Sequence, residues 1–186
     1  MAERKLRHWR LFLGALATLA ELAQLAWQHL HGGVVSHHLL DRADLPAVSN
    51  GWGALLVPAL VWFLTGRIQR RRARCPGATA ATFARKATMG FVVALLFGIC
   101  IAVSFTHGAE SITSDLFQAM VVLAILLPGY RAECVLGFVL GMMFTFGAVL
   151  PTVVAAVVAA LSALVHLGVW PLLVRLRKRV GQGALS

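Results

Sequence analysis

Apolar stretches separated by short polar segments make up most of this chain between residues 11 and 174. An α-helix needs about 20 apolar residues to cross the hydrocarbon core of a bilayer. The pattern predicts membrane-spanning helices over residues 11–30, 52–66, 87–106, 112–127, 134–150 and 151–174. We therefore expect an all-α fold, a polytopic membrane helical bundle with six transmembrane helices, in one integral membrane domain over residues 1–186.

Hydropathy alone does not establish that three of the predicted spans cross the membrane. The first follows a basic start, as in a secretory signal, but it contains Glu21 and lacks a clear small-residue cleavage site. We expect it to be a retained anchor helix. The second and fourth spans are short, so hydropathy alone would also allow them to be tilted or re-entrant.

The placement of Lys and Arg favours six full crossings. With six crossings, all but one of the 17 Lys and Arg residues lie on the side of the N-terminus, and the exception is Arg42. This is the partition that the positive-inside rule predicts. A single re-entrant span would instead export the basic residues that follow residue 174. The sequence thus predicts a multi-pass protein of the cell membrane, the inner membrane of a bacterium, with both termini in the cytoplasm.

Composition agrees with a membrane protein and changes the meaning of the net charge. Hydrophobic residues make up 59% of the chain and charged residues 13%, whereas about 25% of an ordinary soluble domain is charged. The net charge of +10 includes a basic inner loop over residues 67–86, which directly follows an apolar stretch. Anionic lipids at the inner face account for such a loop, so we expect no nucleic-acid partner. We also expect no disulfide, because no cysteine falls outside.

The polar residues of the first span form a stripe. Its members are Glu21, Gln24, Gln28 and His31. Their spacings of three, four and three put them on one face of a helix. A carboxyl group near mid-membrane costs several kcal/mol unless it is protonated, paired or in a wet cavity. We expect the stripe to face the bundle interior and Glu21 to be a proton carrier, a ligand or a general base. A hydrogen-bond network that packs helices is the structural alternative.

The loop between the first two spans, residues 31–51, is predicted to lie outside and holds the densest polar cluster of the chain. Its members are His31, His37, His38, Asp41 and Asp44. A short helix capped by Ser36 would stack His37 and Asp41 one turn apart. Imidazole and carboxylate groups together suit zinc, iron or manganese.

The second outer turn adds His107 and Glu110, three residues apart, with Asp115 soon after. We expect the outer residues to bind a divalent transition metal (zinc, iron or manganese), with Glu21 or Glu110 as the general base. The expected ligands are His31, His37, His38, Asp41 and His107. No spacing among them matches a strong metal motif such as HExxH. The alternative is that these side chains only form hydrogen bonds in a wet loop.

Two further patterns concern packing. In the inner turn LPGYRAEC, we expect Arg131 to pair with Glu133 and to hold the turn between the fourth and fifth spans. Gly137 and Gly141 form a GxxxG pattern in the fifth span, and alanines recur at residues 155, 159 and 163. Such faces of small residues predict close helix packing, within the monomer rather than in a dimer.

Three functions are compatible with these patterns. We expect an integral membrane protein whose outer site binds the metal and acts as a hydrolase or oxidoreductase on a lipid or membrane-soluble substrate. The first alternative is a small transporter or channel, in which a polar path runs through Glu21, Gln24, Gln28, His31 and Asp44. The second is a non-catalytic assembly or pH-sensing subunit, with a protein partner or a second copy of the chain.

Overall fold

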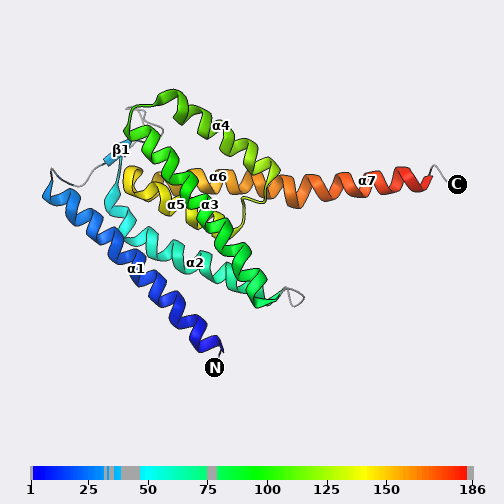
Figure 1. Ribbon diagram of the computed structural model, residues 1–186, viewed down its shortest axis with the longest axis horizontal. Coiled ribbons are helices and arrows are strands. Elements are labelled where there is room, and N and C mark those ends of the chain that lie inside the picture. Colours follow the sequence, from blue (N-terminus) through cyan, green and yellow to red (C-terminus); the bar gives the residue numbers. More distant parts are fainter. Residues whose placement is uncertain (1, 32, 34–35, 39–46, 75–78, 184–186) are drawn as a thin grey trace.

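The computed structural model describes residues 2–31, 33, 36–38, 47–74 and 79–183, and almost all of them are helical. The helices are α1 (Ala2–Leu30), α2 (Gly53–Ala73), α3 (Ala80–Thr106), α4 (Glu110–Leu126), α5 (Ala132–Phe146), α6 (Val149–Ala163) and α7 (Trp170–Gly183). A π-helical segment, Leu164–Val169, joins α6 and α7 into one rod (Figure 1). The described residues therefore form six helical rods, and the predicted all-α bundle is confirmed.

Four helices are long and apolar enough to cross a membrane. Within the described residues they are Arg7–Leu30, Asn50–Ala73, Ala80–Thr106 and Val149–Arg175. The remaining two rods are shorter, with 17 residues in α4 and 15 in α5.

The second predicted span, residues 52–66, is longer in the structure than the sequence predicted. It continues to Ala73 because arginine is a good helix former whose long side chain reaches polar surroundings.

The predicted inner loop over residues 67–86 is mostly helical. α2 continues through its arginine-rich last turns and α3 begins at Ala80, so only residues 74–79 lie between the two helices. The Arg10 side chain links the N-terminal part of α1 to α2. It donates a 2.7 Å hydrogen bond from Nη2 to the carbonyl oxygen of Trp62 and lies over the Trp62 ring.

The boundary between α5 and α6 lies earlier than predicted. α5 ends at Phe146, and Gly147 adopts a φ of 68°, a left-handed conformation that glycine tolerates best. α6 then begins at Val149, which places Pro151 in its first turn, where the missing N–H needs no helical partner. The apolar pattern predicted that the fifth helix extends to residue 150, and this prediction is wrong.

A short hairpin precedes α2. β1 (Ser36–His38) pairs with β2 (Ala47–Ser49) in antiparallel fashion, with Ser36 opposite Ser49. The Ser49 hydroxyl accepts a 3.2 Å hydrogen bond from the Gly51 N–H and caps the 3-10 turn η2 (Asn50–Trp52). The helix predicted to begin at Ser36 is therefore wrong. Residues 36–38 are extended and pair with residues 47–49, so they do not form the first turn of a helix.

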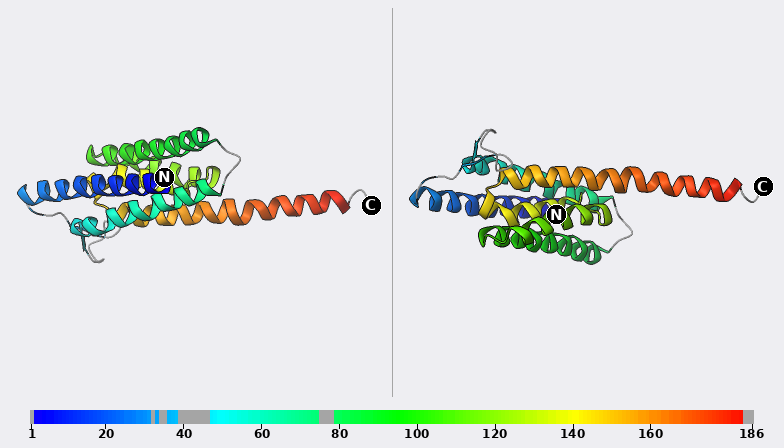
Figure 2. Two further views of the ribbon diagram at one scale, coloured as in Figure 1. Left: turned by 90° about the horizontal axis from the view of Figure 1, so that it is seen from below. Right: turned by 90° about the horizontal axis from the view of Figure 1, so that it is seen from above.

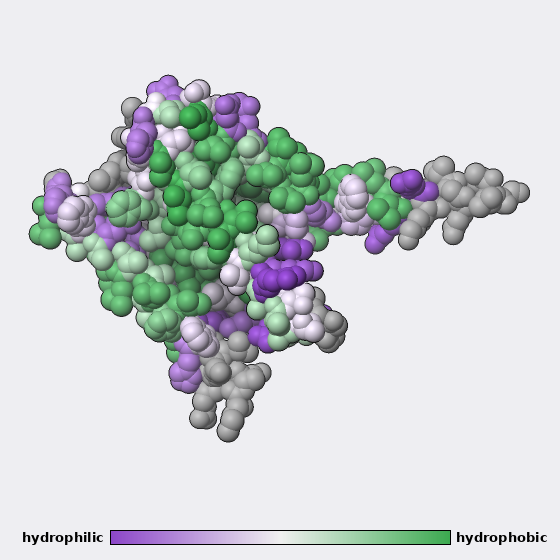
Figure 3. Space-filling model, in the orientation of Figure 1, coloured by the Kyte–Doolittle hydropathy of each residue, from purple (hydrophilic) through white to green (hydrophobic). Residues whose placement is uncertain are grey.

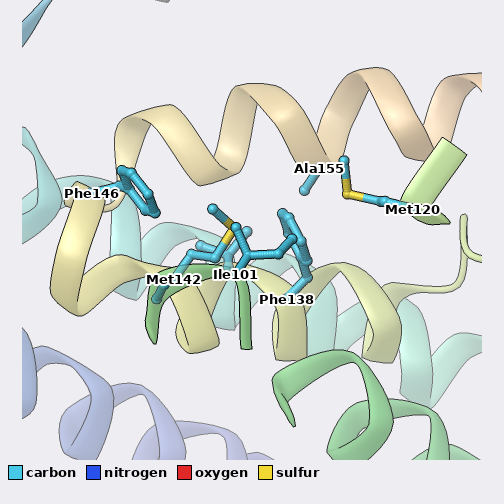
Figure 4. Packing of buried hydrophobic residues seen from close by; sticks show 8 residues of the cluster. Ile101, Met120, Phe138, Met142, Phe146 and Ala155 are labelled. Atoms are coloured by element: carbon cyan, nitrogen blue, oxygen red, sulfur yellow. The ribbon is translucent and has the colours of Figure 1, made fainter. Parts of the chain in front are cut away.

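α5 is the central helix and packs against α2, α3 and α6. Ile101 of α3, Met142 of α5 and Ala155 of α6 belong to one buried apolar cluster (Figure 4). The GxxxG glycines face α3: a side chain at Gly137 or Gly141 would overlap a backbone carbonyl of that helix. The expected close packing within the monomer is therefore confirmed for these two glycines.

Apolar side chains also cover the outside of the bundle. Figure 3 shows hydrophobic residues over the middle of one face and hydrophilic residues at its edges. Leu55 and Phe144 are 70% and 72% exposed. Soluble monomers rarely expose contiguous apolar surface on this scale. The long α6–α7 rod extends beyond the rest of the bundle (Figure 2). This surface and the four long helices are compatible with a multi-pass membrane protein.

Candidate functional site

The polar stripe of α1 faces the bundle interior over most of its length. Glu21 is 1% exposed and Gln24 is 7% exposed, whereas the intervening Leu22 is 47% exposed. Gln28 is partly buried. The predicted orientation is therefore confirmed for these three polar residues. It is wrong for His31, which is exposed because α1 ends at Leu30 and His31 lies in the turn that follows.

Glu21 lies where three elements meet. A methyl group at Gly53, in the first turn of α2, would overlap the Glu21 carboxyl group and lie 3.4 Å from Cβ of Ala148 in the α5–α6 turn. The other carboxyl oxygen, Oε2, is buried and has no hydrogen-bond partner within the described part of the chain. An unpaired carboxylate is costly in such surroundings, so this position calls for a proton or a cation.

Amide groups extend the site from Glu21 toward the C-terminal end of α1. Gln24 Nε2 donates to the carbonyl oxygens of Met143 (3.2 Å) and Phe144 (2.9 Å), near the end of α5. One turn further along α1, Oε1 of Gln28 accepts a 3.3 Å hydrogen bond from Asn50 Nδ2. These bonds join α1 to the end of α5 and to Asn50 of η2, at positions about one helical turn apart along α1.

We call this group of residues the outer polar cluster, after the side of the membrane that the sequence predicts for this end of the bundle. Its members are Glu21, Gln24, Gln28, Asn50 and Gly53. The sequence prediction missed Asn50 and Gly53, as well as Gly147, where any side chain would overlap the Asn50 amide. The local sequence NGWG over residues 50–53 is the only signal for the first two. Their contacts join residues far apart in the chain, which a periodic pattern does not reveal.

Two of the predicted histidine ligands have described side chains, and each is bonded to its own helix. His31 Nδ1 lies 2.9 Å from the carbonyl oxygen of Trp27, and the two rings stack with centroids 3.7 Å apart. His107 Nδ1 lies 2.9 Å from the carbonyl oxygen of Val103. A carbonyl oxygen only accepts hydrogen bonds, so in the neutral ring Nδ1 carries the proton and Nε2 is an acceptor.

The predicted metal site is not assembled within the described residues. Among them, no group of three His, Cys, Asp or Glu side chains could hold a metal ion. Asp41 and Asp44 lie outside the described residues, and so do the side chains of His37 and His38. Glu110, the alternative general base, is exposed in the first turn of α4. Metal binding therefore stays a prediction from the sequence.

A second buried carboxyl group lies near the opposite end of the bundle. Glu133 Oε1 accepts a 2.7 Å hydrogen bond from Arg71 Nη2. The same guanidinium lies over the ring of Phe83, 5.0 Å from its centroid. Arg71 therefore ties α2 to both α3 and α5. The predicted pairing of Glu133 with Arg131 is wrong, because the C-terminal extension of α2 brings Arg71 to the carboxyl group instead.

The two buried carboxyl groups thus have different surroundings. In both groups Oε2 has no hydrogen-bond partner within the described residues, but Oε1 of Glu133 binds Arg71, whereas Glu21 has no basic partner there. Comparisons with protein-family models, with curated proteins and with solved structures found no match. A functional assignment therefore depends on the chemistry of the residues themselves. Glu21 is the strongest candidate, because helix packing does not explain a buried carboxyl group without a basic partner.

Proposed function

We propose that the chain is a small multi-pass membrane transporter or channel, in which Glu21 takes up a proton or a small cation through the outer polar cluster. The observation that carries this proposal is the buried Glu21 carboxyl group, whose Oε2 has no partner among the described residues. Intramembrane ionisable residues without a structural partner usually belong to ion or proton pathways.

The proposed topology has six crossings with both termini in the cytoplasm. The start of α1, the end of α2 and the start of α3 lie toward one end of the bundle, whereas β1 lies toward the other (Figure 1). The first of these ends contains Arg10 of α1, Arg71 of α2 and, just before α5, Arg131, which supports its assignment to the cytoplasmic side. At 1.5 Å per residue, α4 and α5 rise only about 26 Å and 23 Å, so the bilayer would have to be locally thin.

The depth of Glu21 fits this role. It lies two to three residues, or about 4 Å along the axis, from the middle of the Arg7–Leu30 segment. Gln24 and Gln28 follow at one and two turns toward the outer end. Their amide groups offer hydrogen-bond donors and acceptors at steps of one helical turn between the outer surface and the carboxyl group.

Flux into proteoliposomes that contain the purified protein tests the proposal. With an internal pH-sensitive dye and an imposed potential, we expect Glu21→Gln to lower the proton flux by about tenfold or more, because it keeps the shape and removes the ionisable group. Glu110→Gln is the matched control, since it removes an exposed carboxyl group from the outer end of α4. Flux that Glu21→Gln leaves unchanged, in protein that is still folded, would contradict the proposal.

A second candidate function is the metal-dependent enzyme predicted from the outer histidines. The observation that favours it is the Nδ1–carbonyl bond of both His31 and His107, which leaves Nε2 as an acceptor. Metal-binding histidines commonly make such a bond through the ring nitrogen that does not bind the metal. The substrate would be a lipid or another membrane-soluble molecule, and Glu21 or Glu110 would act as the base.

A further inference from the structure

A cleft of about 380 Å³ lies between α3 and α4, in the half of the bundle away from the outer polar cluster. It is lined by the first half of α3 and the last half of α4, which are joined at their other ends by residues 107–109. Its walls include Met89, Val93 and Phe97 of α3 together with Leu123 of α4. The cleft is therefore a mainly apolar space between α3 and α4.

The floor of the cleft consists of side chains from the two helices behind it. α5 contributes Phe138 and Val135, and α6 contributes Ala155 and Val158. Phe138 and Ala155 also belong to the buried core, so the floor is part of the packed bundle. A volume of this size holds part of one acyl chain but is too apolar to be a water-filled site.

Cationic side chains lie at the inner end of this cleft. Lys86 lines it at the start of α3, and Arg131 lines it just before α5. Glu133 is also part of the lining, but its charge is paired with Arg71. The inner end of the cleft therefore has a net positive charge, next to a long apolar wall.

We propose that the cleft binds one anionic phospholipid, with an acyl chain between α3 and α4 and the phosphate beside Lys86 and Arg131. The apolar walls match the chain, and the two cations match a headgroup with net negative charge. The proposal rests on insertion into a membrane, as in the proposed function, but not on any role of Glu21. Detergent-solubilised protein tests it without a transport assay, so the two proposals can fail separately.

Native mass spectrometry of the purified full chain measures this binding directly. The probes are phosphatidylglycerol and phosphatidylcholine with identical acyl chains, titrated into delipidated protein. We expect one phosphatidylglycerol to bind about tenfold or more tightly than phosphatidylcholine, because each cation near a headgroup contributes about fivefold. Lys86→Gln should reduce this preference by about fivefold. Arg85→Gln is the matched control, since Arg85 is the exposed neighbour on α3 and does not line the cleft.

A second pair of variants tests the acyl-chain position. Val93→Trp should fill the cleft and abolish the tight phosphatidylglycerol complex, whereas Val92→Trp, at an exposed neighbour outside the lining, should retain it. If Val93→Trp does not fold, Leu123→Trp with Val122→Trp as its control makes the same test from the opposite wall.

Three results would overturn the proposal. Equal retention of the two lipids would mean that the cleft selects no headgroup. Equal losses from Lys86→Gln and Arg85→Gln would mean that the lipid contacts the basic face generally. The delipidated protein could also be a dimer. If Val93→Trp dissociates that dimer, a second copy of the chain covers the cleft.

Discussion

The carboxyl group of Glu21 lies against the backbone of Gly53, so that α1 and α2 meet there without a second side chain between them. This contact lies in the first turn of α2 and next to the buried Ala148 of the α5–α6 turn. The absence of a side chain at residue 53 is therefore what makes room for a carboxyl group in the interior. The relationship leads to a stability prediction that does not depend on any transport assay.

Gly53→Ala should destabilise the protein, although alanine is the better helix former. The added methyl group overlaps the Glu21 carboxyl group, and such overpacking costs about 1–3 kcal/mol in the free energy of unfolding. Thermal unfolding followed by circular dichroism measures the change. Gly14→Ala is the control, because a methyl group there meets no atom within 4 Å and should leave the protein as stable or more stable. Adding Glu21→Ala to Gly53→Ala should recover part of the loss. No recovery would contradict this origin of the effect.

Arg71→Gln should destabilise the protein by leaving the Glu133 carboxyl group without its partner. Breaking a buried, charge-assisted hydrogen bond costs about 1–3 kcal/mol, since the remaining group stays desolvated. We expect the double variant Arg71→Gln, Glu133→Gln to lose less than the sum of the two single variants, as unfolding measurements on all three would reveal. Arg72→Gln, at an exposed neighbour, should change the stability by less than about 0.5 kcal/mol. Additive losses would show that the two side chains do not interact.

Cysteine labelling in cells tests the proposed topology. In a chain whose three natural cysteines are replaced by serine, Thr106→Cys should react from outside with a membrane-impermeant maleimide. Thr79→Cys should react only after the membrane is opened, because it lies beside the arginine-rich end of α2. Both positions are exposed, so the difference between them reports sidedness and not burial. External labelling of Thr79→Cys in intact cells would reverse the proposed orientation.

Elemental analysis of the purified protein tests the metal prediction. The enzyme hypothesis predicts close to one equivalent of zinc, iron or manganese, and His37→Ala should lower that content because it removes a ligand. Treatment with a chelator should remove the metal from the unsubstituted protein in the same way. His166→Ala is a suitable control, since His166 is bonded to the Ser162 carbonyl oxygen within the α6–α7 rod, away from the predicted ligands. A content below about a tenth of an equivalent, unchanged in His37→Ala, would exclude the metal site.

Several local features of this protein could be predicted from the sequence because they depend on neighbours in the chain. The inward orientation of Glu21 and Gln24 follows from their helical spacing, and the burial of both confirms it. The close packing at Gly137 and Gly141 follows from their small size, which lets the backbone of α3 approach. The periodic pattern could not identify the strand at Ser36–His38, because backbone pairing with residues 47–49 overrides a local capping signal.

The sequence by itself determined that the chain is a helical bundle with an apolar surface and one basic end, since hydropathy and charge are summed along neighbouring residues. Only the tertiary structure decided which groups meet: Glu21 with Gly53, Asn50 with Gln28, and Arg71 with Glu133. Each of these contacts joins different elements. Arg71, and not Arg131, which is closer in the sequence, pairs with Glu133, because α2 extends beyond its apolar run. The pairing of buried polar groups depends on how helices are placed in space, because a buried group bonds to whatever lies within about 3 Å of it, however distant in the chain.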